Sequence, residues 1–267
     1  MSMPATRRLP RDAEGDRLGL VEQLPKGRAH VRSSDESLAA GEAVAGYVIH
    51  MEQLQMAHPY DYGERLDVFE VLPQEFSSVL DVGCSRGGFC ALVKRARPEC
   101  QVWGIEPDRD AADEASSRTD RIVIGQFPQD MPADAPQFDV ITFSDVLEHL
   151  VEPGEALSAA SSKLTSNGVV IASIPNIRHW RGIKSIVIEG DFTYTETGLF
   201  DRTHLRFFTR STMLRLFEEC GFRVETCVPS NMMSHRSARL LRRLFPRFGG
   251  EITTLHYIIR GRPESEA

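Results

Sequence analysis

The sequence has no long hydrophobic run, no closely paired cysteines and no excess of basic residues. No window approaches the roughly 18 consecutive apolar residues of a membrane-spanning helix, and the N-terminal arginines precede no apolar core of a secretory signal. The five cysteines are odd in number and form no CxxC pair, which argues against a disulfide framework and a cysteine zinc site. We expect buried thiols in a reducing, cytoplasmic compartment.

The charge balance is acidic, with 31 Lys and Arg against 38 Asp and Glu and a formal net charge of −7. A nucleic-acid binder needs a basic surface, so nucleic acid is not an expected partner. The 267 residues, 41% of them hydrophobic, are enough to bury a large core.

Composition divides the chain into three segments. Residues 1–42 are rich in charged residues, Gly, Pro and Ser, and are predicted to be a mobile tail. Residues 43–77 are predicted to form a helical lid, with helices over 43–56 and 64–72. Residues 78–267 alternate short β-rich runs with helical segments, which predicts an α/β domain around a mostly parallel, seven-stranded sheet.

The elements of this third segment are predicted from its periodicity and its turn residues. The predicted strands are Val79–Val82, Gln101–Glu106, Arg121–Ile124, Phe138–Phe143, Val169–Ile174, Phe222–Cys227 and Leu255–Arg260. The predicted helices lie near Phe89–Ala96, Asp110–Ser117, Glu155–Leu164, Ile183–Ile188 and Ser211–Cys220.

The clearest local pattern is an apolar strand that runs into a glycine-rich turn at residues 83–88 (GCSRGG) and then a helix. Such a turn lets a ligand approach bare backbone and the amides of a helix N-terminus. Glu106 ends the next strand, 19 residues after Gly87, where a carboxylate suits the hydroxyls of a ribose. The pair predicts a nucleoside-containing cofactor.

Two residues discriminate between cofactors. A dinucleotide fingerprint needs glycine where Ser85 stands, so that the backbone can approach a pyrophosphate. Asp81, at the mouth of the loop, would repel a pyrophosphate and attract the ammonium or sulfonium of S-adenosylmethionine. S-adenosylmethionine is therefore favoured, and an NAD-dependent oxidoreductase is the alternative.

Residues 81–87 (DVGCSRG) resemble the first motif of class I S-adenosylmethionine-dependent methyltransferases, with Ser85 in place of the middle glycine. Residues 138–150 (FDVITFSDVLEHL) resemble the fourth-strand segment of this family, and Pro175-Asn176 also fits. The resemblance implies a Rossmann-like fold with helices on both faces, an antiparallel last strand, and S-adenosyl-L-methionine as the cofactor.

The same resemblance implies the cofactor residues. Asp81 and the glycine loop would line the methionine end, Glu106 would hold the ribose, and Gln126 would lie near the adenine amine. The full predicted set is Asp81, Gly83, Cys84, Ser85, Gly87, Glu106, Pro107, Gln126, Ser144 and Asp145.

His149 is the first candidate for a general base, because it follows the fourth strand at the edge where open α/β sheets bind ligands. If this segment is helical, Asp145 and His149 share a face. His149 would otherwise only make a hydrogen bond across a loop. Glu148 and His149 alone make a weak metal site, and no second ligand pair is evident, so no metal is predicted.

Residues 176–209, which follow the fifth strand, are too polar and irregular for a strand and are predicted to cap the binding edge. Residues 199–209 (LFDRTHLRFFT) resemble a bacterial methyltransferase subgroup associated with glycosyltransferases and with surface-polysaccharide or natural-product assembly. This implies a saccharide-like or otherwise hydroxylated small acceptor. His204 is the second catalytic candidate, although a polar network that only holds the cap is equally compatible. The predicted acceptor-binding residues are Asn176, Tyr194, Asp201 and Arg206.

Residues 235–248 carry five arginines among leucines and phenylalanines that segregate on a helix. Such a helix either packs on the sheet with a solvated basic face or lies on an anionic membrane that presents a lipid-linked acceptor. Taken together, the sequence predicts a cytoplasmic S-adenosylmethionine-dependent O-methyltransferase. A cofactor-binding scaffold without catalysis, in a biosynthetic assembly, is a further alternative.

Overall fold

The computed structural model describes residues 63–233 and 235–264. All of them belong to Met56–Ala267, the second of two units into which the chain divides. The predicted tail at 1–42 and the predicted helix at 43–56 lie outside the described residues.

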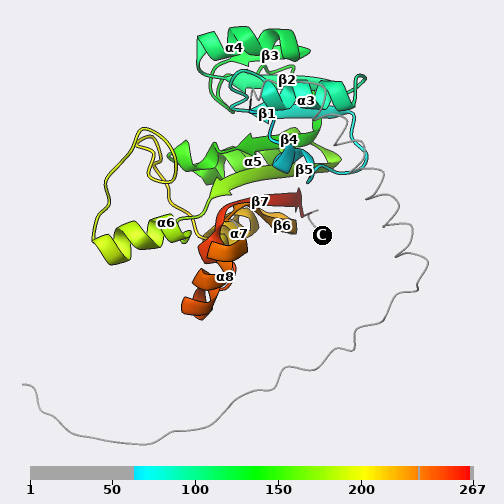
Figure 1. Ribbon diagram of the computed structural model, residues 1–267. Helices are drawn as coiled ribbons and strands as arrows, with labels where there is room; N and C mark the ends of the chain where they lie inside the picture. The colour runs from blue at the N-terminus through cyan, green and yellow to red at the C-terminus, as the bar shows by residue number, and fades with distance from the viewer. Residues whose placement is uncertain (1–62, 234, 265–267) are drawn as a thin grey trace, which may run out of the picture. The chain divides into compact units, whose positions relative to one another are not determined.

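One seven-stranded sheet, with the strand order β3-β2-β1-β4-β5-β7-β6, organises the described chain (Figure 1). The strands β1 to β5 run parallel to one another, and β7 lies antiparallel between β5 and β6. All seven predicted strands and the antiparallel last strand are confirmed. Their bounds are β1 (Ser78–Val82), β2 (Gln101–Glu106), β3 (Arg121–Ile124), β4 (Phe138–Ser144), β5 (Leu164–Pro175), β6 (Phe222–Met232) and β7 (Thr254–Pro263).

The helices follow the strands as the alternating pattern predicts. They are α2 (Leu66–Phe69), α3 (Gly88–Ala96), α4 (Arg109–Ala115), α5 (Pro153–Lys163), α6 (Trp180–Ile183), α7 (Arg210–Glu219) and α8 (His235–Leu244). The predicted helix at 64–72 is reduced to the four residues of α2. The predicted helix at 183–188 is a π-helical turn, Lys184–Glu189, that continues α6.

Two proline residues lie where the C-terminal elements differ from their predicted bounds. The predicted helix at 235–248 ends at Leu244, because Pro246 cannot continue the backbone hydrogen bonds, and a short 3₁₀ turn follows. The strand β6 is longer than predicted and contains Pro229. Proline is tolerated there because β6 is an edge strand and needs hydrogen bonds on one side only.

The core lies around the central strands. All five residues of β1 are buried, including Leu80 and Val82. Continuous burial of this kind is typical of parallel strands covered on both faces. The carboxyl ends of β1, β2 and β4 therefore present their loops at one edge of a rigid platform.

The predicted cap, residues 176–209, lies between β5 and α7 and projects beyond the sheet as the yellow-green to yellow segment of Figure 1. Its two ends are joined by a bridge between Asn176 and Phe208, in which the Ile177 amide donates to the Phe208 carbonyl (2.8 Å). Residues 176–208 are thus closed into a loop by backbone pairing next to the binding edge.

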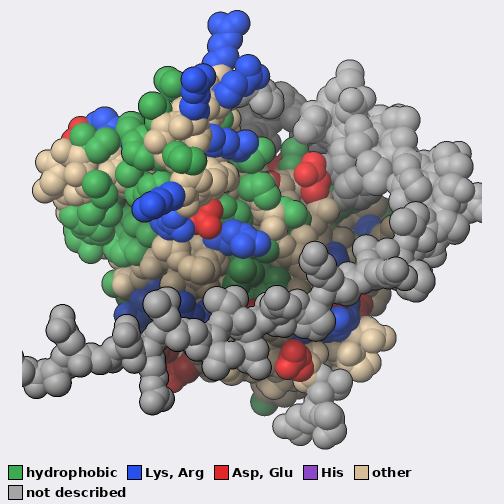
Figure 2. Space-filling model, turned by 90° about the horizontal axis from the view of Figure 1, so that it is seen from below, with side chains coloured by type: hydrophobic (Ala, Val, Ile, Leu, Met, Phe, Trp, Pro, Cys, Tyr) green, Lys and Arg blue, Asp and Glu red, His purple; other side chains and the backbone are tan. Residues whose placement is uncertain are grey.

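The helix α8 packs through Ala238 and Leu241 and leaves Leu240 and Leu244 more than half exposed. Arg236, Arg239 and Arg243 are exposed, and Figure 2 shows basic side chains gathered near hydrophobic ones on the face seen from below. Within the residues that the structure describes, no helix is both long and apolar enough to cross a membrane.

Candidate functional site

The loop between β1 and α3 contains three residues with left-handed backbone: Gly83 (φ 69°), Ser85 (φ 47°) and Gly87 (φ 76°). At Gly83 a Cβ atom would lie 2.6 Å from Cγ2 of Val146, so a side chain cannot be accommodated without movement. The glycine-rich sequence therefore folds as the predicted turn, with backbone that a ligand can approach closely.

Glu106, the last residue of β2, fixes this loop from the neighbouring strand. Its Oε2 accepts a hydrogen bond from the Ser85 amide (2.8 Å), and its Oε1 accepts one from the Asp108 amide (3.0 Å). A carboxylate has about four acceptor sites, so Glu106 retains capacity for the predicted hydrogen bonds with ribose hydroxyls.

A cavity of about 760 Å³ is lined by these loops and by the segment after β4. Its volume is typical of a cofactor or small-molecule site. Phe127 and Pro128 add an apolar surface, and His149 lines the same cavity. The predicted cofactor residues among its lining are Gly83, Glu106, Pro107, Gln126 and Asp145.

Asp81 lies in the core and is not among the residues that line the cavity. It is 2% exposed, and its carboxylate accepts hydrogen bonds from the Thr142 hydroxyl (2.6 Å) and the Cys90 thiol (3.6 Å). Burial raises its pKa to about 6, against the lowering effect of the Thr142 and Cys90 hydrogen bonds. The negative charge of Asp81 therefore acts on this end of the loop from within the core.

Two other predicted cofactor residues also have buried side-chain atoms. The thiol of Cys84 packs against β2, where a Cβ atom on Gly104 would lie 2.6 Å from the sulfur. The Ser144 hydroxyl is buried and, among the described residues, has no hydrogen-bond partner. Cys84 can thus offer a ligand only its backbone.

Asp145 takes a left-handed conformation (φ 56°) directly after β4. Its carboxylate pairs with Arg65 (2.8 Å), accepts a hydrogen bond from Ser173 (2.9 Å) and lies 3.7 Å from Nε2 of His256. The helical condition under which Asp145 and His149 would share a face is not met, because the chain continues as a 3₁₀ turn, Leu147–His149. Arg65 and His256 were not predicted as site residues. They lie far from Asp145 in the sequence, and no local motif marks them.

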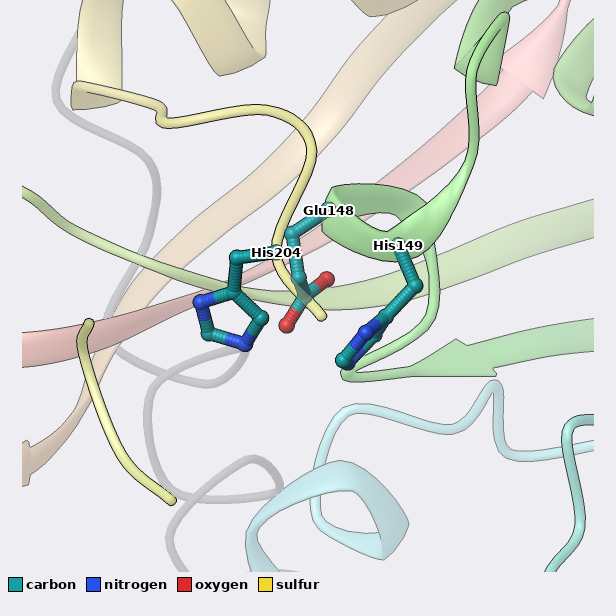
Figure 3. Close-up of side chains that lie close together, drawn as sticks. All are labelled: Glu148, His149 and His204. Atoms are coloured by element: carbon teal, nitrogen blue, oxygen red, sulfur yellow. The ribbon is translucent and has the colours of Figure 1, made fainter. Parts of the chain in front are cut away.

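His149 lies instead beside the second predicted catalytic residue, His204, with ring centroids 4.7 Å apart. The carboxylate of Glu148 lies close to both rings (Figure 3). Glu148 is 1% exposed, and burial together with the nearby charge of Asp145 raises its pKa well above the usual range. Burial and neighbouring His149 lower the pKa of His204. The turn after β4 and the cap thus bring three titratable groups together.

The four predicted acceptor-binding residues separate into two kinds. Asn176 is fully buried, and its amide donates to the carbonyls of Glu251 and Thr254 (both 2.9 Å), so it supports the fold next to β7. Tyr194, Asp201 and Arg206 lie in the cap. The Tyr194 side chain is exposed, Asp201 accepts hydrogen bonds from Thr203, and Arg206 donates to the Val151 carbonyl (3.1 Å).

The family model of the methyltransferase domain matches residues 52–226, which include the glycine loop, the cavity and the cap. The chain belongs to the methyltransferase domain family. The predicted class of enzyme, an S-adenosylmethionine-dependent methyltransferase, is thereby confirmed at the level of family and fold.

A solved S-adenosylmethionine-dependent methyltransferase from Archaeoglobus fulgidus is 20% identical, with a TM-score of 0.54 over 80% of this chain and 98% of its own. A plantazolicin methyltransferase solved in complex with S-adenosylhomocysteine is 16% identical, with a TM-score of 0.52 over 74% and 80% of the two chains. Both share the fold of this domain.

Among curated proteins, a ubiquinone biosynthesis O-methyltransferase from Bradyrhizobium diazoefficiens is 26% identical over 118 residues, 43% of this chain and 46% of its own. The chain thus spans about half the length of this relative.

Proposed function

We propose that the protein transfers a methyl group from S-adenosylmethionine to a hydroxyl oxygen of a small, saccharide-like or otherwise hydroxylated acceptor. One observation carries the proposal: the cavity that contains Gly83 and Glu106 is also lined by His149, beside the cap. A nucleoside methyl donor and an acceptor base therefore share one space. The name of the O-methyltransferase relative supports oxygen as the methylated atom.

S-adenosylmethionine supplies, when bound, a sulfonium methyl group that reacts by in-line displacement. The protein has to hold the donor, align the acceptor oxygen and exclude water, and alignment alone supplies effective molarities of about 10⁵ to 10⁸ M. The glycine loop and Glu106 serve the first task, and the cap serves the other two.

His149 is the proposed base for the acceptor hydroxyl. Its Nδ1 lies 3.2 Å from the Thr203 carbonyl oxygen, which can only accept a hydrogen bond. Nδ1 therefore carries the proton, and the lone pair of Nε2 is free to receive the proton of a hydroxyl group. In the overall reaction the acceptor oxygen gains the methyl group, the donor becomes S-adenosylhomocysteine, and one proton passes to His149.

Compartment and partners follow from the same proposal. The five cysteines are free, which supports the cytoplasm as the place of action. The expected partner is the small acceptor, presented as a free, nucleotide-linked or lipid-linked molecule.

The first experiment is calorimetric titration with S-adenosylhomocysteine and with NAD. We expect binding of S-adenosylhomocysteine only, weakened at least about tenfold in Glu106→Ala, because the variant lacks both the ribose acceptor and the hydrogen bond to Ser85. Binding of NAD alone would replace the proposal with the oxidoreductase alternative. Binding of S-adenosylhomocysteine without turnover of any acceptor would favour the scaffold alternative.

The second experiment follows release of S-adenosylhomocysteine with a panel of nucleotide-linked sugars, lipid-linked sugars and phenols. We expect His149→Ala to abolish turnover and to leave the affinity for S-adenosylhomocysteine within about twofold of wild type. Glu196→Gln, in an exposed part of the cap, is the matched control and should retain activity. Turnover of His149→Ala at the wild-type rate would show that His149 has no part in the reaction.

A further inference from the structure

The turn after β4 and the cap bring one carboxylate and two imidazoles to a single point. One ligand atom each from Glu148, His149 and His204 lie within 4.8 Å of one another. Figure 3 shows the three side chains converging, with two from the turn and the third from the cap. His204 follows His149 by 55 positions in the sequence, so only the fold makes them neighbours.

The carboxylate of Glu148 lacks a partner in a place where it needs one. Both of its oxygens are buried, and neither has a hydrogen-bond partner among the described residues. Leaving a buried polar group unsatisfied costs about 1–3 kcal/mol, and more for a charged group. A buried carboxylate aimed at two imidazoles is therefore suited to a cation that fills the space between them.

Both histidines are oriented with a free nitrogen. Nδ1 of His149 lies 3.2 Å from the Thr203 carbonyl oxygen, and Nδ1 of His204 lies 3.3 Å from the Leu199 carbonyl oxygen. Each Nδ1 must donate to its carbonyl, which leaves Nε2 with a lone pair. A backbone partner on one ring nitrogen and a free lone pair on the other is the usual arrangement of a metal-ligating histidine.

The cap is held at this point by its own backbone. The amides of Leu205 and Arg206 donate to the carbonyl of Glu148 (2.8 and 3.0 Å). These two bonds follow His204 directly in the chain, so they keep its ring next to the Glu148 side chain.

We propose that Glu148, His149 and His204 bind a divalent transition-metal ion of the zinc class. Two imidazole nitrogens and one carboxylate oxygen are a donor set that suits zinc and its neighbours rather than magnesium or calcium. Tetrahedral bonds of about 2.0–2.1 Å place ligand atoms roughly 3.4 Å apart, so the side chains close by about 1.5 Å at most. Since His149 lines the cavity, an ion held by these three residues would be accessible to a molecule bound there.

This inference rests on the proposed function and changes the role of His149. With Nε2 of His149 held by the ion, the ion would supply the acidity that lowers the pKa of the acceptor hydroxyl, whose proton would pass to solvent instead of to His149. The acceptor oxygen would then bond to the methyl carbon as the carbon–sulfur bond breaks, with S-adenosylhomocysteine as the leaving group. His149 and His204 would then both be metal ligands, rather than a first and a second candidate for the catalytic base.

The test is titration of the chelator-treated full chain with Zn²⁺ by calorimetry and with Co²⁺ by visible absorption. We expect one equivalent to bind, with the intense absorption bands of a tetrahedral Co²⁺ site. His204→Ala and Glu148→Gln should each lower the affinity more than about a hundredfold, because loss of an outer partner of a ligand alone costs about 10–100-fold. Glu196→Gln, an exposed acidic residue of the same cap, should bind as wild type does.

Affinity for S-adenosylhomocysteine, measured on the same variants, reports whether they are folded. Glu148→Gln is isosteric and serves if His204→Ala does not fold. Absence of stoichiometric binding to wild type, or wild-type affinity in both variants, would overturn the metal site and leave the proposed methyl transfer standing. Metal binding without S-adenosylhomocysteine binding would overturn the proposed function and leave the metal site standing.

Discussion

At the scale of single residues, Asp81 is an ionisable side chain that folding buries away from solvent. Burial raises its pKa from the ordinary 3.8 to about 6. Between these two values the folded protein holds a proton that the unfolded chain has lost. The contribution to stability is therefore fully present below about pH 4 and is lost as the pH rises through 6.

The prediction is that the Asp81 contribution to the free energy of unfolding falls by roughly 2–3 kcal/mol between pH 4 and pH 7. Asp81→Asn lacks this titration, so the difference between variant and wild type should change with pH by that amount. Urea unfolding at pH 4, 5.5 and 7 measures it. A variant whose free energy of unfolding runs parallel to that of wild type across this range contradicts the buried, raised pKa.

Gly83 is the residue at which backbone shape and space both matter. A methyl group there would lie 2.6 Å from Cγ2 of Val146, and φ is 69°. We expect Gly83→Ala to lower the free energy of unfolding by about 2–4 kcal/mol from crowding and strain, and to weaken S-adenosylhomocysteine binding at least about tenfold. Urea unfolding and calorimetry measure the two effects.

Gly190 offers a matched control, because its φ is 67° and nothing lies within 4 Å of an added Cβ atom. Gly190→Ala should therefore show only the backbone penalty of about 1–2 kcal/mol and normal ligand affinity. Equal effects of the two substitutions would mean that contact with Val146 has no role in shaping the loop.

At the scale of elements, α8 has more apolar exposure than its packing explains. Leu240 and Leu244 are 58% and 61% exposed, on a helix whose arginines Arg236, Arg239 and Arg243 also face solvent. Exposed leucines next to arginines suit the headgroup region of an anionic membrane. Arg242 differs, because it donates to the Thr253 hydroxyl and belongs to the fold.

We expect the protein to cosediment with vesicles that contain phosphatidylglycerol. With vesicles of phosphatidylcholine, the protein should remain in the supernatant. Each basic residue near such a surface contributes about 1 kcal/mol, so Arg239→Gln with Arg243→Gln should weaken binding roughly tenfold or more. A partition coefficient equal for both lipids, or unchanged in the double variant, would instead leave α8 as a packed helix with a solvated face.

At the scale of the whole domain, the ligand and the fold stabilise one another. The cavity is built from the loops that follow β1, β2, β3 and β4, so a molecule bound there links four successive strands. We expect S-adenosylhomocysteine at about a hundred times its dissociation constant to add about 2.7 kcal/mol to the free energy of unfolding. In a domain of this size that corresponds to a rise in Tm of about 5–10 °C by calorimetry. NAD at the same concentration should produce no shift, and an equal rise with NAD would contradict the cofactor assignment.

The sequence by itself determined the sheet, the order of its strands along the chain and the glycine loop. These features are local: hydrophobic runs, glycines at special backbone positions and a carboxylate at the end of a strand act through near neighbours in sequence. For the same reason it predicted Gly83, Glu106 and His149 at one edge of the sheet.

Only the tertiary structure decided which side chains meet. It placed Asp81 behind the loop, tied Asn176 to β7, and turned Asp145 toward Arg65 and His256. It also brought Glu148, His149 and His204 together, because His149 and His204, 55 positions apart, become neighbours only when the cap folds back on the turn after β4. Burial and long-range pairing belong to the packed molecule, so no local pattern in the sequence contains them.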